Sequence, residues 1–255
     1  MNYKKLYEKQ YGKKKLVNLP QRQFLGLRRL LKKYDWDRYY LVEQLVDSGE
    51  RILDIGCGDG YMLGKLKDKF EELYGLDIAP SRLRAAETKI KKLYPLEASK
   101  FKFIEGNVDQ SLPFPDNFFD AIICIAVMEH VYDIFSLVKE MHRVLKPGGY
   151  VVAEVPNIAY LKYRIQLLLG KLPITSSPLN WQGIGWDGGH IHYFTMKKFC
   201  WLFEQQEFKV EKKTGAGFLA KFRNWWPSLL TGDLCVKAQK IKKYENITYN
   251  GQYLS

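Results

Sequence analysis

The chain has 255 residues, of which 46% are hydrophobic and 27% charged, a composition that supports a packed core and excludes wholesale disorder. No apolar run approaches the roughly 20 residues that a membrane-spanning helix needs, and no apolar stretch follows the basic residues 1–5, so we expect neither a transmembrane segment nor a secretory signal. The cysteines Cys57, Cys124, Cys200 and Cys235 are far apart, and three lie in apolar runs, which indicates reduced, buried thiols in a cytoplasmic protein.

The formal net charge of +12 is concentrated at the amino-terminal end. Residues 1–33 hold eleven Lys or Arg against the single acid Glu8, which gives this segment a charge of +10. Such a basic arm could meet nucleic acid, an anionic membrane surface or an acidic substrate, or it could be a solvated helical face.

Residues 1–50 are predicted to form a basic, helical lead-in. From residue 51 to about 150, short β-rich runs alternate with helical patterns, which is typical of βαβ units and a parallel sheet. The pattern predicts strands at 51–55, 72–77, 102–105, 121–125 and 150–155, and helices at 61–69, 80–93 and 134–145. The last of these helices should stop at Pro147, Gly148 and Gly149. The fold class is therefore α/β, with a Rossmann-like, doubly wound sheet.

After the fifth strand, residues 157–189 break this rhythm with Gly, Pro, Ser and Trp, and we expect an inserted lid there. A helix at 197–206 and β-rich runs at 208–213 and 234–237 should close the domain. The main domain is thus predicted to span residues 51–240, followed by a polar tail at 241–255.

The most informative stretch is residues 52–60, ILDIGCGDG, an apolar strand that runs into a glycine turn and a helix. Glycines here let a ligand approach the backbone, and the following helix offers free N–H groups. The spacing G-x-G-x-G differs from the G-x-G-x-x-G of a pyrophosphate site. The acidic residue Asp54 precedes the turn on the strand.

Three further polar elements follow predicted strands. Asp77 ends the second strand, where its carboxylate could accept hydrogen bonds from both ribose hydroxyls of a nucleoside. Asn107, Val108 and Asp109 follow the third strand, at a place suited to the edge of an adenine. The run 118–131, FFDAIICIAVMEHV, contains the fourth strand. All these elements fall at carboxyl ends of strands, where open α/β sheets bind ligands.

These motifs resemble class I S-adenosylmethionine (SAM)-dependent methyltransferases over about residues 51–155. "LDIGCGDG", "GLDIAPSRL", "GNVDQSLPFPDNFFDAIICIAVMEHV" and "EMHRVLKPGGYVVAEVPN" occur in the family's order. The resemblance implies a seven-stranded sheet, SAM as the cofactor and methyl transfer. It assigns Gly56 and Gly58 to the methionine end of SAM, with Asp54 beneath the loop. It assigns Asp77 to the ribose and Val108 and Asp109 to the adenine, with Ile78, Asn107 and Ala126 completing the expected contacts.

From residue 156 onward the chain is similar to the MetW-like proteins of methionine biosynthesis, on "PNIAYLKYRIQLLLGKLPIT" and "HIHYFTMKKF". That likeness implies a SAM-binding partner protein of a homoserine acetyltransferase. The long basic lead-in and the run Trp186-Asp187-Gly188-Gly189 depart from it.

Three histidines are candidates for a general base, which a hydroxyl acceptor would need. His130 follows the fourth strand, and His190 and His192 follow the lid; each could equally be a structural histidine. Neutral imidazoles are available near pH 7. His190 and His192 would point the same way on a strand and could hold a metal, but spacing places no carboxylate beside them, so we predict no metal site.

The sequence defines the acceptor less well than the cofactor. Five lid residues suit a flat, sugar-like or anionic acceptor, or merely pack the lid shut: Tyr160, Tyr163, Arg164, Trp181 and Trp186. The leading hypothesis is methyl transfer from SAM to a hydroxyl or amine of a small-molecule or glycan-type acceptor. The alternatives are a MetW-like partner protein and an RNA methyltransferase that uses the basic arm. Residues 217–227 mix aromatic and basic side chains, so they could rest on a membrane surface or wall the active site.

Overall fold

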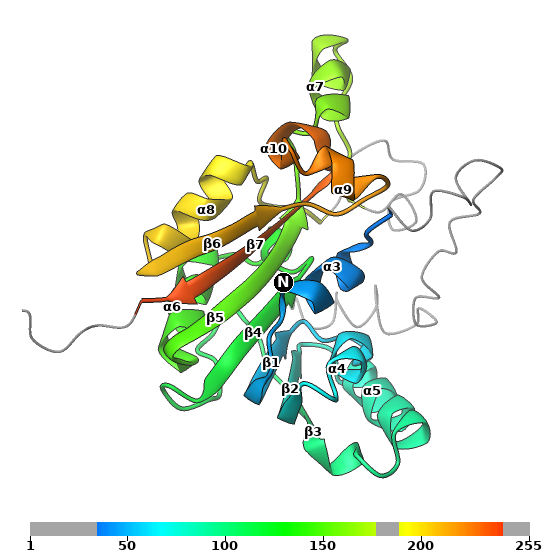
Figure 1. The fold of residues 1–255 in the computed structure, drawn as a ribbon, viewed down its shortest axis with the longest axis vertical. Helices are drawn as coiled ribbons and strands as arrows, with labels where there is room; N and C mark the ends of the chain where they lie inside the picture. Colours follow the sequence, from blue (N-terminus) through cyan, green and yellow to red (C-terminus); the bar gives the residue numbers. More distant parts are fainter. Residues whose placement is uncertain (1–34, 177–188, 242–255) are drawn as a thin grey trace, which may run out of the picture.

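The computed structural model describes residues 35–176 and 189–241, which build one seven-stranded sheet in the order β3-β2-β1-β4-β5-β7-β6 (Figure 1). The strands are β1 (Gly49–Ile55), β2 (Phe70–Asp77), β3 (Phe101–Glu105), β4 (Phe119–Ile125), β5 (Leu145–Pro156), β6 (Phe208–Thr214) and β7 (Asp233–Lys240). The basic residues 1–33, the lid residues Trp181 and Trp186, and the tail from residue 242 lie outside the described residues.

The sheet is parallel from β3 through β5, and β7 then runs antiparallel to both β5 and β6. The chain order reverses between β1 and β4, so the carboxyl ends of these two strands flank the crevice where doubly wound sheets bind ligands. The predicted α/β class, the doubly wound sheet and its seven strands are confirmed.

Helices cover both faces of this sheet, as Figure 1 shows. The helices α3 (Arg38–Leu45), α4 (Tyr61–Lys65) and α5 (Pro80–Leu93) cover one face, and α6 (Ile134–Val144) and α8 (Met196–Glu204) cover the other. Side chains alternate along β1: Leu53 and Ile55 pack with α6 and α8, whereas Ile52 packs with α3 and α4. All four cysteines are buried free thiols, as predicted.

Helix α6 passes into β5 with no intervening loop. The helix ends at Val144 and the strand begins at Leu145, before Pro147. Proline has no N–H for a helical hydrogen bond and disfavours helical backbone in the residue before it. The sequence signals for a stop were therefore correct, but the following glycines lie inside the longer strand.

Helix α3 lies within the predicted lead-in, and residues 38–45 are helical as expected. The Asp37 carboxylate caps its first turn by accepting the Tyr40 N–H at 2.8 Å. Leu41 and Val42 are buried against the sheet. This helix therefore carries Arg38 to the strand ends that form the site.

Two segments of the chain between β5 and β7 extend beyond one end of the sheet. Helix α7 (Leu161–Leu168) follows β5, in the range of the predicted lid, and α9 (Ala220–Arg223) and α10 (Pro227–Leu230) precede β7. The buried Asn157 joins them, because its side-chain amide donates to Thr231 O at 2.8 Å and Ser228 O at 3.1 Å. The three helices gather at the top of Figure 1.

Candidate active site

The turn after β1 is a tight loop that only glycine permits. Gly56 and Gly58 have φ of 73° and 57°, in the left-handed region. A Cβ on Gly56 would lie 2.3 Å from Val127 Cγ2, and one on Gly58 would lie 2.3 Å from Arg82 Nη2. The N–H groups of Gly56 and Cys57 donate to Leu76 O at 2.7 and 3.1 Å. The loop is thus held against the ends of β2 and β4, and the Arg82 side chain lies over its backbone at Gly58.

Asp77 joins this loop to the start of α5. Its Oδ2 accepts the Gly58 N–H and its Oδ1 accepts the Ala79 N–H, both at 2.9 Å. Arg82 Nη1 lies 3.7 Å from Asp77 Oδ2. Asp77 is 5% exposed, and Asp54 is buried beside it, where burial and then the Asp77 charge raise the pKa of Asp54 well above its ordinary range. A carboxylate at a strand tip beside a glycine loop fits the ribose of an adenosyl ligand.

The predicted adenine-edge residues lie next to Asp77, because the Gly106 N–H donates to Asp77 O at 3.1 Å. Asn107 Oδ1 accepts the Asp109 N–H at 3.0 Å, and Asp109 Oδ1 accepts the Tyr132 N–H at 2.7 Å. Of the other predicted contacts, Ile78 and Val108 are half-buried, and Ala126 has φ of 53° at the end of β4. All of these residues border the same end of the sheet, while their contacts with a cofactor stay predictions.

A second group of side chains forms at the end of β4, on the 3₁₀ turn Met128–His130. The Glu129 carbonyl accepts the N–H groups of Ile191 at 2.9 Å and His192 at 3.3 Å, which fixes the segment after the lid against this turn. His190 Nε2 consequently lies 4.0 Å from Glu129 Oε1. The rings of His130 and His190 meet edge to face, with centroids 4.8 Å apart.

Glu129 is the functional candidate that sequence reasoning missed. Glu129 is 1% exposed. Burial raises the pKa of its carboxyl to about 7, against a backbone hydrogen bond and the charge of Arg38, which both lower this pKa. Its Oε2 has no hydrogen-bond partner within the described part of the chain. The neighbouring His130 was the available signal, but a burial that depends on residues 191 and 192 was not visible in the sequence.

Among the residues that the structure describes, Glu129, His130 and His190 are the group whose donor atoms could hold a metal ion, since these atoms lie within 4.8 Å of one another. The sequence analysis found no carboxylate near His190, and the fold supplies Glu129. His192 lies apart from this group: its Nε2 is 3.3 Å from Tyr132 O, and residues 190–192 are not in a strand.

An ion-pair network lies at the ends of β5 and β7, beneath the group of Glu129, His130 and His190. Arg38 Nη1 lies 3.4 Å from Glu154 Oε2, and Arg38 Nη2 lies 3.3 Å from Asp233 Oδ2. The Glu154 side chain is fully buried, which raises the pKa of its carboxyl well above the ordinary range, with Arg38 opposing. The Ala126 N–H donates to Glu154 O at 3.0 Å, so the network borders the site.

The comparisons with known proteins agree with this geometry. Residues 53–153 match the family model described as "Methyltransferase domain". A demethylmenaquinone methyltransferase of Lysinibacillus sphaericus is 32% identical over 185 residues, which cover 67% of this chain and 74% of the relative. A ubiquinone biosynthesis O-methyltransferase of Aliivibrio fischeri is 28% identical over 110 residues, covering 43% of this chain and 45% of the relative.

A solved SAM-dependent methyltransferase from Methanosarcina mazei shares the fold, with a TM-score of 0.60, 24% identity and coverage of 81% of this chain and 100% of that one. The chain spans about half the length, 53%, of the first curated relatives it matches. SAM is the cofactor of this family, and the glycine loop and Asp77 fit it. The chain therefore belongs to the class I SAM-dependent methyltransferases.

Proposed function

We propose that this protein transfers the methyl group of SAM to a hydroxyl or amine of a small organic acceptor. The observation that carries the proposal is the contact of the glycine loop with the end of β4, where Gly56 lies against Val127. Val127 directly precedes the turn that bears Glu129 and His130. A cofactor loop and a group of potential bases are thus adjacent, which methyl transfer to a protic acceptor requires.

The cofactor side of the proposal uses the glycine loop and Asp77. Gly56 and Gly58 would receive the methionine end, Asp77 the ribose hydroxyls, and Asn107 to Asp109 the adenine. When bound, SAM supplies a methyl group already activated by its sulfonium, so the protein's main contribution is to align acceptor and donor. Asp54, which lies beneath the glycine loop, would help to hold the loop in place.

On the acceptor side, Glu129, His130 and His190 are the proposed proton-accepting group. Burial brings the pKa of Glu129 to about 7, so its carboxylate can accept a proton near neutral pH. His190 Nε2 lies 4.0 Å from Glu129 Oε1, beyond hydrogen-bond distance, so it would take up that proton only once the two side chains come closer. His192 stays a weaker candidate, because it contacts the Tyr132 carbonyl instead.

A hydroxyl on a small aromatic or quinone-related molecule is the acceptor class we favour. One relative is named as a demethylmenaquinone methyltransferase, which supports a quinone-related small molecule as acceptor. The other is named as a ubiquinone biosynthesis O-methyltransferase, and its name alone supports transfer to a hydroxyl oxygen. A glycan acceptor has no such support. The RNA alternative depends on the basic residues 1–33, which lie outside the described residues, and is not carried further.

The first test is binding of SAM to the purified chain by calorimetry. We expect Asp77→Ala to weaken binding severely, whereas Asp68→Ala, which removes a carboxylate with 81% exposure, should not. Equal affinity of the two variants would remove Asp77 from the cofactor site.

The second test is transfer of labelled methyl from SAM to a panel of hydroxylated quinones, phenols and amines. We expect incorporation into at least one hydroxyl compound. A chain that binds SAM but methylates no acceptor, and instead retains a protein partner, would favour the partner-protein alternative.

A further inference from the structure

Helix α7 presents an apolar face that stays partly or largely exposed within the described structure. None of its residues is buried, unlike those of a helix that packs on a core. Leu161, Ile165 and Leu168 follow one another at i, i+4 and i+7, and they are 40%, 47% and 86% exposed. Exposed leucines at helical spacing are costly in water, which indicates a contact beyond the described residues.

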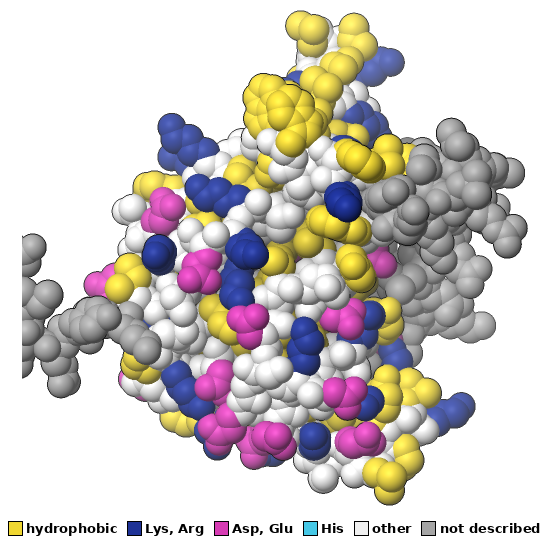
Figure 2. Space-filling model, viewed as in Figure 1, with side chains coloured by type: hydrophobic (Ala, Val, Ile, Leu, Met, Phe, Trp, Pro, Cys, Tyr) yellow, Lys and Arg dark blue, Asp and Glu magenta, His cyan; other side chains and the backbone are white. Residues whose placement is uncertain are grey.

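Aromatic side chains continue this apolar surface across α9 and α10. Phe222, Trp225 and Trp226 are 58%, 78% and 49% exposed. We call these three residues, together with Leu161, Ile165 and Leu168, the apolar crest. Figure 2 shows apolar side chains gathered at this end of the molecule, above the sheet.

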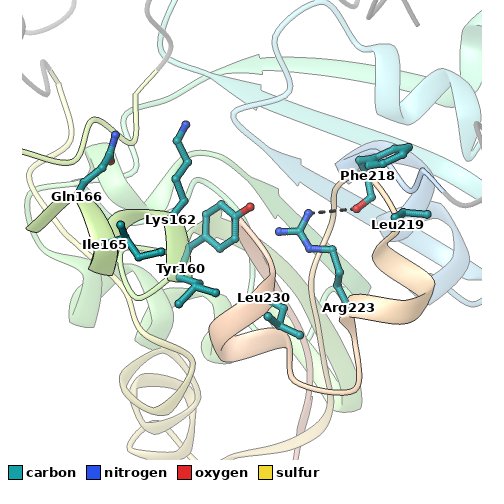
Figure 3. Close-up of a pocket in the computed structure, with 9 residues that line it drawn as sticks. Tyr160, Lys162, Ile165, Gln166, Phe218, Leu219, Arg223 and Leu230 are labelled. Carbon is teal, nitrogen blue, oxygen red and sulfur yellow. Dashed lines mark hydrogen bonds between the residues drawn. The ribbon is translucent and has the colours of Figure 1, made fainter. Parts of the chain in front are cut away.

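A groove lies beside the crest, and Figure 3 shows the residues that line it, among them the crest residue Ile165. It has a volume of about 520 Å³ and is lined by α7 on one side and by α9 and α10 on the other. Lys162 and Arg223 border it, and the Arg223 guanidinium lies 5.0 Å above the Tyr160 ring. The groove thus pairs apolar walls with cations at its rim.

The segments that carry the crest are exclusively basic in charge. Residues 157–176 and 217–232 contain five cations and no Asp or Glu, although the chain has 28 acidic residues. The cations are Lys162, Arg164, Lys171, Lys221 and Arg223. Charge of one sign around exposed leucine and tryptophan complements an anionic lipid surface.

We propose that the apolar crest docks this protein on the surface of an anionic lipid bilayer. Tryptophan is enriched where hydrocarbon meets water, and Lys and Arg stems can lie along apolar groups while their charges reach lipid phosphates. Among the described helices, none has the length and hydrophobicity to cross a bilayer. The crest would therefore lie in the interface, with the leucines of α7 entering the headgroup region.

The position of the crest relates docking to the active site. Asn157 directly follows β5 and forms a bridge with Phe194, two residues after His192. Helix α7 thus leaves the sheet at the same end of the strands that carries Glu129 and His190. Docking would present this end of the sheet to the bilayer, so an acceptor with a lipid tail could reach Glu129 and His190. This last step, unlike the docking itself, rests on the proposed function.

Sedimentation of the full chain with vesicles tests the docking. Vesicles of equal parts phosphatidylglycerol and phosphatidylcholine should bind the chain, and pure phosphatidylcholine should bind it more weakly. Lys162→Glu/Lys221→Glu should lower binding to the anionic vesicles at least about twenty-fold, since each cation near such a surface contributes about five-fold. Trp225→Ala/Trp226→Ala should lower binding to both vesicle types.

Matched controls change the same residue types elsewhere. Lys91→Glu/Lys92→Glu alters the exposed end of α5, at the other end of the molecule in Figure 1, and Trp201→Ala removes a partly exposed tryptophan from α8. Both should bind vesicles nearly as well as the parent chain. Thermal unfolding and SAM calorimetry on every variant separate a docking defect from misfolding or from a failed cofactor site.

Two outcomes would overturn the proposal. The first is vesicle binding that the crest variants leave unchanged, because lipid would then be held by another part of the chain. The second is a concentration-dependent dimer that the crest variants dissociate, together with no vesicle binding, since the crest would then be an interface between copies of this chain.

Discussion

The Arg82 guanidinium lies across the glycine loop, with Nη1 3.7 Å from Asp77 Oδ2. Its Nη2 stands 2.3 Å from where a Cβ on Gly58 would be, so it covers the backbone that the cofactor is expected to approach. A ribose that bonds to Asp77 must share this carboxylate with Arg82 or displace it. The cation also repels the sulfonium of SAM.

We therefore predict that Arg82→Ala tightens SAM binding severalfold. The gain should be smaller for the demethylated product, whose sulfur carries no charge. Calorimetry of both ligands checks this, with Arg84→Ala on the exposed side of α5 as the control. Weaker binding of SAM to Arg82→Ala would mean that Arg82 instead contacts the cofactor.

Glu129 should set the pH dependence of methyl transfer. Burial raises the pKa of its carboxyl to about 7, so the carboxylate that accepts a proton accumulates above that pH. With a hydroxyl acceptor, the rate should rise through about pH 7. Glu129→Gln should lower kcat by about 10²–10⁴-fold and abolish the rise, while Glu71→Gln on the exposed surface should do neither. A Glu129→Gln enzyme that retains the rise would assign it to His130 or His190.

The same carboxyl should make the fold less stable at alkaline pH. In the unfolded chain the pKa of Glu129 is near its ordinary value of 4.5, so between pH 4.5 and about 7 only the folded state holds the proton. Stability contributed by this group is therefore present below pH 4.5 and lost as pH rises to about 7.

Glu129→Gln removes this loss, because an amide stays neutral. The difference between 4.5 and about 7 corresponds to roughly 3 kcal/mol, so we expect the variant to be more stable than the parent at pH 8 by up to that amount. Urea unfolding at pH 5 and pH 8 measures it. Identical pH dependence of the two proteins would contradict the buried, raised carboxyl.

The glycine loop and the position of Asp77 were predictable because their signals are local, while their contacts with a cofactor stay predictions. Gly56 and Gly58 directly follow β1, and Asp77 ends β2. The positive φ of the two glycines is a requirement that the sequence itself records. The strands were likewise visible from apolar runs bounded by turn residues.

The group of Glu129, His130 and His190, which we propose for the acceptor side, was not predictable, because long-range contacts create it. Glu129 meets His190 only because its carbonyl accepts N–H groups from residues about 60 positions later. Arg38 meets Glu154 across 116 positions of sequence, from a helix whose packing partner the sequence does not indicate. No periodicity or spacing encodes such contacts.

Arg38 is the charge partner of the fully buried Glu154, and its removal should be costly. With Arg38→Met the Glu154 carboxyl keeps its burial and loses its nearest cation, so we expect a loss of about 3–5 kcal/mol at pH 8. The pKa of Glu154 is already raised, and without Arg38 it rises further. The carboxyl then takes up a proton more readily, so the loss should shrink as pH falls toward 5.

Adding Glu154→Gln to Arg38→Met should restore most of the stability at pH 8, because no unpaired charge stays buried. Urea unfolding of the two single variants and the double variant closes the cycle. Additive losses would mean that Arg38 and Glu154 do not stabilise one another.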